Sequence, residues 1–205
     1  MLSVFHNSEI LTDRSIITLN KEQILNSTIK SLSIYVTPLK IVNNALQIMF
    51  YNLRSIRSAI AQNVNHTASI IRTDDDFLIL IEYGAYDKDN MFYYYKEDDG
   101  LRFIQISDSI FMSLMNDGRN ACVHCNIQNE ISIRDLLFHT ETINGFNRWD
   151  KNSYNLITHN CQYFVKCVMK VLGATKDFSV NDKNIPILIQ TELFRNEFSN
   201  DNLTP

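Results

Sequence analysis

Cys161 is the residue whose type and position most favour chemistry. It lies in the stretch 154–165 (YNLITHNCQYFV), at the first position of a segment with helical periodicity. The first-turn amides of a helix lack intrahelical partners, and the helix dipole favours negative charge there. A thiol in that place has a lowered pKa and is more available as thiolate. We therefore interpret Cys161 as a nucleophile, and Cys167, which lies in mid-helix, as a core residue.

A nucleophilic cysteine needs a base, and His66 is the best placed histidine. It comes directly before the β-leaning run 67–72, where a side chain can project from a sheet edge into a cleft. His159 is two residues from Cys161, but it precedes the helix cap, so its side chain is expected to point away from the thiol. Core or surface roles suffice for His124 and His139, and His6 is expected in an unanchored N-terminal segment.

Glu82 is the candidate third member, which would orient the imidazole. It is an unusual residue in the otherwise apolar run 77–84 (FLILIEYG). If the turn before that run uses three residues, His66 lies opposite Glu82 on the same face of the paired strands. A turn of even length would instead place Tyr83 opposite His66. A charge that faces solvent near a strand end is the simpler alternative for Glu82.

The other polar clusters do not predict a metal or cofactor site. Cys122 and Cys125 form one C-x-x-C around His124, but zinc needs about four ligands and no second pair has suitable spacing. A redox C-x-x-C opens a helix, whereas this pair lies within a strand-like run. The acidic runs 74–76 and 97–99 are interpreted as solvated turns. We therefore expect no metal and no cofactor.

Periodicity predicts the elements that must position these residues. Strands are expected at 15–19, 31–36, 67–72, 77–84, 91–96, 101–106 and 121–127. Helices are expected at 39–61, from Ser132 through Phe138, at 161–172 and at 186–198. Asn160 is a good N-cap for the helix of Cys161, and Gly173 is a good residue to end it. The pattern has no internal repeat and indicates one α+β domain.

Composition narrows the class of protein further. The chain has 205 residues, of which 45% are hydrophobic and 20% charged, so a globular domain with a real core is expected. The net charge of −4 gives no support to nucleic-acid binding. The start of the sequence has no signal-peptide pattern, and no apolar run reaches the roughly 18 to 20 residues of a membrane span. We expect an intracellular, cytoplasmic protein with four free thiols.

The cysteine segment resembles that of the circularly permuted papain-fold enzymes. Asn160-Cys161-Gln162-Tyr163-Phe164-Val165 is similar to the N-C-E-H-F-V block of the lecithin-retinol acyltransferase-like proteins and to the N-C-N-H-F block of the PPPDE isopeptidases. Trp149, Tyr154 and Leu156 suit the approach to that block, and His66 with its apolar strand resembles the family's histidine strand. Gln162 and Tyr163 differ from both branches, so the substrate branch stays open.

The resemblance covers roughly residues 64–173 and implies both a fold and an organisation of the chain. The fold would be α+β and permuted papain-like, an antiparallel sheet packed against helices, with the nucleophile at a helix N-terminus. Residues 1–63 would be an N-terminal extension of strands and a helix. Residues 64–175 would be the catalytic core, and residues 176–205 a C-terminal tail with a short helix.

The expected chemistry is thiol-based acyl transfer. The Cys161 thiolate would attack an amide, isopeptide, ester or thioester carbonyl of a protein or lipid substrate, with His66 acting as base and then as acid. Glu82 would hold the imidazole. The backbone amide of Cys161, with Gln162 and Asn160 nearby, would stabilise the oxyanion and position the substrate. Water as acceptor gives a hydrolase and a second nucleophile gives a transferase.

Two other functions remain open at this point. A catalytically inactive papain-like binding module would have a blocked pocket, or a separation between the His66 ring and the Cys161 sulfur well beyond about 5 Å. A membrane-lipid acyltransferase or phospholipase would have an exposed apolar patch beside its cleft. The net charge of −4 does not suggest the basic surface expected for anionic lipids.

Overall fold

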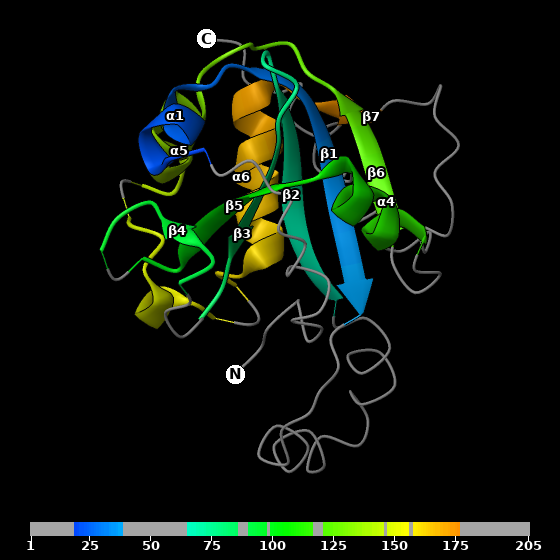
Figure 1. Cartoon of the computed structure of the whole chain (residues 1–205). Coiled ribbons are helices and arrows are strands. Elements are labelled where there is room, and N and C mark those ends of the chain that lie inside the picture. Colours follow the sequence, from blue (N-terminus) through cyan, green and yellow to red (C-terminus); the bar gives the residue numbers. More distant parts are fainter. Residues whose placement is uncertain are drawn as a thin grey trace, which may run out of the picture.

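The fold is α+β, and its centre is one antiparallel sheet with helices on both faces (Figure 1). The computed structural model describes residues 19–38, 65–85, 90–97, 99–116, 121–145, 147–155 and 158–176. Its strands are β1 (Ile29–Pro38), β2 (Asn65–Thr73), β3 (Leu78–Tyr83), β4 (Tyr93–Tyr94), β5 (Leu101–Ile106), β6 (Ala121–Asn126) and β7 (Thr175–Lys176). Its helices are α1 (Lys21–Asn26), α4 (Asp108–Asn116), α5 (Ile133–Ile143) and α6 (Cys161–Leu172), with a 3₁₀ turn, η2 (Lys151–Ser153). The strand order is β4-β5-β3-β2-β1-β6-β7.

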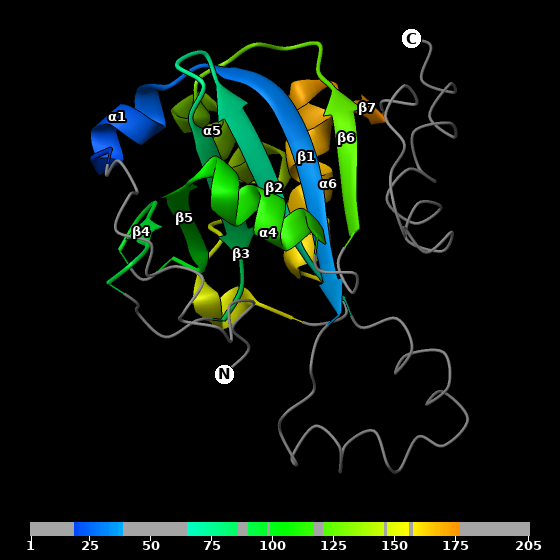
Figure 2. The same ribbon diagram turned by 45° about the vertical axis from the view of Figure 1, so that its right-hand side comes forward.

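The two faces of the sheet carry separate apolar cores. Figure 2 shows α4 in front of the sheet and α5 and α6 behind it. Successive side chains of β3 alternate between these cores: Leu78 and Leu80 pack with α4, whereas Ile79 and Ile81 pack with α6. Because both faces are covered, β3 can be apolar along nearly its whole length, as its sequence predicted.

Helix α6 begins at Cys161 and ends at Leu172, as its periodicity predicted. The side chain of Asn160 caps its first turn by accepting a hydrogen bond from the backbone N–H of Tyr163, at 3.0 Å. Gly173 ends the helix with φ of 57°, in the left-handed region that glycine adopts without steric cost. The Asn160 cap fixes where the helix starts, and therefore places the thiol in its first turn.

Strand β1 lies in the middle of the sheet, between β2 and β6. It pairs over nearly its full length with β2, for example Ile34 with Ser69, and on its other edge with β6, for example Ile34 with Val123. One sheet thus joins a strand from the segment 1–63 to strands from the segment 64–175. The core of the protein therefore begins before residue 64, and residues 29–38 are not an extension to it.

Several predicted elements are confirmed, and others differ. The strands at 31–36, 67–72, 77–84, 101–106 and 121–127 are present, within two residues at their ends. The helix capped by Ser132 is also present, but it continues to Ile143, five residues beyond Phe138. The run 91–96 is extended only at Tyr93–Tyr94. The sequence interpretation missed α1, α4 and β7, which are short. The predicted elements at 15–18, 39–61 and 186–198 lie outside the described residues.

Candidate active site

The candidate site lies where the hydrogen-bonded ladder between β2 and β3 ends. The last pair of that ladder is Ser69 with Ile81. Beyond it, β2 continues to pair with β1, for example His66 with Thr37, and β3 continues to pair with β5, for example Glu82 with Arg102. The two strands thus have different partners at this end of the sheet, and the first turn of α6 reaches the sheet here.

His66 and Glu82 meet across these strands. Their Nε2 and Oε2 atoms are 3.0 Å apart, and the two residues are 4% and 0% exposed. Neither register considered from the sequence is present, because the ladder places Glu82 level with Ala68, two residues from His66. An offset of two residues keeps both side chains on one face and within diagonal reach. His66 and Glu82 therefore make the predicted contact, although they are not directly opposite each other on the paired strands.

The thiol of Cys161 also interacts with this imidazole. Burial favours the neutral thiol, but charge attraction and hydrogen bonding with His66, and the backbone N–H of Thr67, together lower the pKa of Cys161 to about 7. His66 and Thr67 are neighbours whose side chains alternate between the faces of β2. The Cys161 thiol thus interacts with two successive residues of β2, in the part of that strand that no longer pairs with β3.

The pKa of His66 moves the opposite way. Burial favours the neutral ring, but the Cys161 thiolate and the Glu82 carboxylate outweigh burial and raise the pKa of His66 to about 10. Nε2 of this ring faces Glu82, and the same imidazole interacts with the Cys161 thiol. Between about pH 7 and pH 10 the two groups can exist as a thiolate–imidazolium pair.

Arg102 is a member of the cluster that the sequence interpretation missed. Its Nε donates to Glu82 Oε1 at 2.6 Å, and its Nη2 lies at the same distance from that oxygen. Its guanidinium lies over the ring of Phe92, 4.0 Å from the centroid. Burial opposes ionisation of Glu82, but Arg102 and then His66 lower the pKa of this carboxyl below its ordinary value. The signal was present: Glu82 and Arg102 are the charged residues of two otherwise largely apolar strands.

The loop before α6 is fixed by an aromatic cluster around His159. The ring of His159 stacks on Trp149, with centroids 4.8 Å apart. Its Nδ1 lies 3.0 Å from the hydroxyl of Tyr83, which itself donates to the carbonyl of Asp150. Its Nε2 lies 2.9 Å from the side-chain nitrogen of Asn144. Both ring nitrogens thus have structural partners, and His159 serves to anchor the segment that leads into Cys161.

Tyr154 brings a further polar atom to the sulfur. Its hydroxyl donates toward Cys161 Sγ at 3.9 Å, and burial raises the pKa of this phenol. Asn160 uses its side-chain oxygen to cap α6, and Gln162 is half-buried at the second position of the helix. The oxyanion and substrate-positioning roles suggested for Asn160 and Gln162 remain predictions.

The other cysteines provide a contrast to Cys161. Cys167 is buried in the core, and burial raises the pKa of its thiol to about 11. Cys122 and Cys125 are buried on β6, and the intervening His124 hydrogen-bonds through Nδ1 to the hydroxyl of Ser33, at 2.9 Å. In the described ranges, no three His, Cys, Asp or Glu side chains gather in a way that could hold a metal ion.

The exposed apolar side chains bear on the lipid-enzyme alternative. None of the helices that the structure describes is both long and apolar enough to cross a bilayer. The exposed large apolar side chains of the described residues are Met91 beside β4, Met112 on α4 and Phe138 on α5. Since α4 and α5 cover opposite faces of the sheet, these three side chains do not form the single patch that a lipid enzyme would present beside its cleft.

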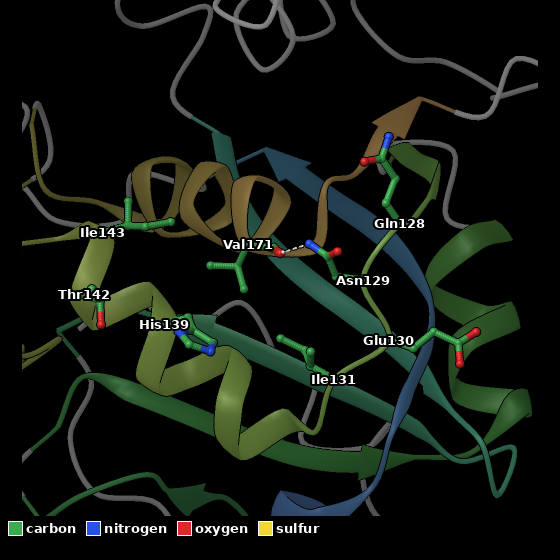
Figure 3. A pocket seen from close by; sticks show the side chains of 8 residues that line it. All are labelled: Gln128, Asn129, Glu130, Ile131, His139, Thr142, Ile143 and Val171. Carbon is green, nitrogen blue, oxygen red and sulfur yellow. Dashed lines mark hydrogen bonds between the residues drawn. The ribbon is translucent and has the colours of Figure 1, made fainter. Parts of the chain in front are cut away.

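A hollow of about 550 Å³ opens at the far end of α6 (Figure 3). Its lining residues are Gln128, Asn129, Glu130, Ile131, His139, Thr142, Ile143 and Val171. The side chain of Asn129 donates to the carbonyl of Val171 at 2.8 Å, which ties the loop after β6 to the helix. Ten residues of helix separate Cys161 from Val171, about 15 Å along the axis, so the hollow is distinct from the thiol site.

Comparison of the chain with protein-family models, curated proteins and solved structures finds no match.

Proposed function

We propose that this protein is a cysteine-dependent hydrolase or acyltransferase with a permuted papain-like fold. Cys161 would be the nucleophile, His66 the general base and acid, and Glu82 the group that orients the imidazole. The observation that carries the proposal is the contact of one buried imidazole with both the Cys161 thiol and the Glu82 carboxylate. Such a nucleophile–base–orienting group is the arrangement by which protein thiols are activated.

The proposed reaction has two steps. The thiolate sulfur of Cys161 attacks the carbonyl carbon of an amide, isopeptide, ester or thioester, and the bond to the leaving group breaks. The imidazolium of His66 donates its proton to that leaving group. Water, or the nucleophile of an acceptor molecule, then attacks the thioester while His66 takes its proton, and the free thiolate returns. The backbone N–H of Cys161, at the start of α6, would stabilise the oxyanion in both steps.

The arrangement of elements supports the permuted papain-like fold. His66 and Glu82 stand on neighbouring antiparallel strands that precede the helix of Cys161 in the chain. The nucleophile is the first residue of that helix, and the helix packs against one face of the sheet. This is the order that the Asn160–Val165 segment suggested by its resemblance to the acyltransferase-like and isopeptidase proteins.

Covalent trapping tests the proposal directly. We expect iodoacetamide at pH 7.5 to modify Cys161 of the folded protein before the other three thiols, as mapped by mass spectrometry of peptides. The Cys161→Ala variant should lose this fast labelling, whereas Cys167→Ala, the matched control on the same helix, should keep it. An activated ester such as a p-nitrophenyl acyl ester should leave an acyl adduct on Cys161. Equal fast labelling of the Cys161→Ala variant and the parent would remove Cys161 from the role.

Burial of the thiol favours the second candidate, an inactive papain-like binding module. Cys161 is 2% exposed, so a substrate carbonyl reaches the sulfur only if neighbouring groups move. The binding-module hypothesis expects Cys161 to resist iodoacetamide in the folded protein at every pH up to 9 and to react once denaturant is added. The enzyme hypothesis expects labelling of the native protein, so the same experiment separates the two.

A further inference from the structure

We propose that Arg102 is a positioning residue that balances the charge of Glu82, so that His66 can release and regain its proton while the carboxylate stays ionised. This inference rests on the proposed thiol mechanism and adds a fourth member to its machinery. The contact that carries this role is the one between Arg102 and Glu82, so Arg102 acts on the imidazole through the carboxylate.

The contacts of Glu82 divide between its two oxygens. Oε2 faces Nε2 of His66 at 3.0 Å, and Oε1 receives the guanidinium of Arg102 at 2.6 Å. Glu82 and Arg102 are direct cross-strand partners on β3 and β5, with 0% and 3% of their surfaces exposed. The stacking of Arg102 on Phe92 holds the guanidinium from its other side. The carboxylate therefore has a permanent cation on one oxygen and a titrating group on the other.

A count of buried charges shows what that cation does. With Arg102 present, the thiolate, imidazolium, carboxylate and guanidinium sum to zero, and so do the neutral thiol and imidazole beside the Glu82–Arg102 pair. His66 can therefore lose its proton to a leaving group without leaving a net charge in the site. Without Arg102, the same transfer would leave Glu82 as an uncompensated buried anion, which is strongly unfavourable.

The same count predicts how the thiol titrates. In the parent protein, removal of the first proton from the Cys161–His66 pair takes the cluster from +1 to zero. In an Arg102→Met variant that step takes the cluster from zero to −1, so it requires a higher pH. The charged and titratable groups around this pair include Glu82 from β3, which contacts His66, and Tyr154 from the loop before α6, which contacts Cys161. Arg102 from β5 lies behind Glu82.

The test is the pH dependence of Cys161 alkylation by iodoacetamide, measured in full-length protein with folding checked by circular dichroism. Arg102→Met should raise the midpoint by at least about one pH unit, which slows labelling about tenfold below the midpoint. Arg102→Lys keeps the charge and should stay near the parent midpoint. An Arg102→Met midpoint equal to that of the parent overturns the proposal.

A double variant separates charge balance from packing. Glu82→Gln combined with Arg102→Met removes both charges, so the first deprotonation again takes the cluster from +1 to zero, and the midpoint should return toward that of the parent. If Arg102 had only a packing role, altering a second buried residue would not bring the alkylation midpoint back toward that of the parent. A double variant that keeps the raised midpoint of the single variant overturns the proposal.

Two further outcomes of these experiments also test the proposal. If Arg102→Met alone fails to fold, the double variant decides by itself, since it leaves no unpaired charge: a folded double variant with the parent midpoint supports the proposal, and one with a raised midpoint overturns it. If the parent protein shows no labelling of Cys161 with a lowered midpoint, the proposed thiol function fails first. By contrast, if the parent shows the lowered midpoint and the Arg102→Met variant has the same midpoint, only the proposed role of Arg102 fails.

Discussion

At Cys161, effects of opposite sign set the pKa of the thiol. Burial alone raises a thiol pKa, and Cys167, six residues further along the same helix, shows that effect at about 11. Cys161 is buried to a similar degree, yet its pKa falls to about 7 because His66 and the Thr67 amide favour the thiolate. The difference between two thiols of one helix therefore comes from their neighbours on the sheet.

Replacement of His66 should reverse this balance. In a His66→Ala variant burial is no longer opposed by a neighbouring cation, and hydrogen bonds from Thr67 and Tyr154 remain. The pKa of Cys161 should therefore rise from about 7 to the ordinary thiol value of 9.0 or beyond. Labelling by iodoacetamide at pH 7 should slow at least about fiftyfold, because the thiolate fraction falls from about one half to about 1% when the pKa rises by two units. The measurement is the alkylation rate of Cys161 between pH 5.5 and 9.5.

The same two pKa values predict how alkylation and turnover by the parent protein change with pH. Alkylation should rise through about pH 7 as thiolate forms, and turnover of an acyl substrate should fall above about pH 10, because His66 then lacks the proton for the leaving group. The two midpoints belong to the coupled pair and not to either residue alone. A His66→Ala profile identical to that of the parent would contradict the assignment of the base.

Helix α6 holds the thiol in place through its cap. Asn160 satisfies the N–H of Tyr163, and the loop before it is anchored by His159 against Trp149. The thiol can point at β2 only if the helix begins at residue 161, so the cap and the aromatic anchor contribute to the geometry of the site as well as to stability.

Asn160 variants separate these contributions. Asn160→Ala should lower the free energy of unfolding by about 1 kcal/mol, the usual cost of losing an N-cap. Asn160→Asp should keep the cap and the stability, but its carboxylate stands next to the thiol and should raise the pKa of Cys161. Urea unfolding measures the first effect and the pH midpoint of alkylation measures the second. Equal alkylation midpoints in Asn160→Asp and the parent would argue against a thiolate at this helix start.

In the whole molecule, β1 joins the site to the rest of the core. It pairs with β2, which carries His66, and with β6 on its other edge. Its inward residues Ile34 and Val36 belong to the same apolar core as α6. The strand comes from the part of the sequence that the resemblance to a family did not cover, and it lies at the centre of the sheet.

Deletion of residues 1–63 should therefore abolish folding. A 64–205 fragment lacks β1, which leaves the facing edges of β2 and β6 without a partner and opens the apolar core. We expect circular dichroism to show no cooperative thermal transition for the fragment, against a cooperative transition for the full chain. A fragment that unfolds cooperatively would show instead that residues 64–175 are an autonomous core.

Local patterns predicted a substantial part of this fold. The apolar run of β3, the strand LRFIQI of β5 and the capped helix from Cys161 are each visible in a short stretch of sequence, because periodicity and caps are local properties. Short elements such as α1 and α4 were missed because few residues carry their signal. The position of β1 inside the sheet depends on its pairing with β2 and β6, which are distant in the chain. The sequence of a strand does not encode such partners.

By itself, the sequence determined which residues were candidates: a cysteine at a helix start, a histidine before a strand and a glutamate in an apolar strand. Only the tertiary structure decided that these three meet, because contact depends on the register of β2 against β3 and on where their ladder ends. The tertiary structure also added Arg102, which faces Glu82 through the β3–β5 pairing. Residue types and helix caps can be recognised in a short stretch of sequence, whereas the charge balance of a buried site depends on which strands become neighbours.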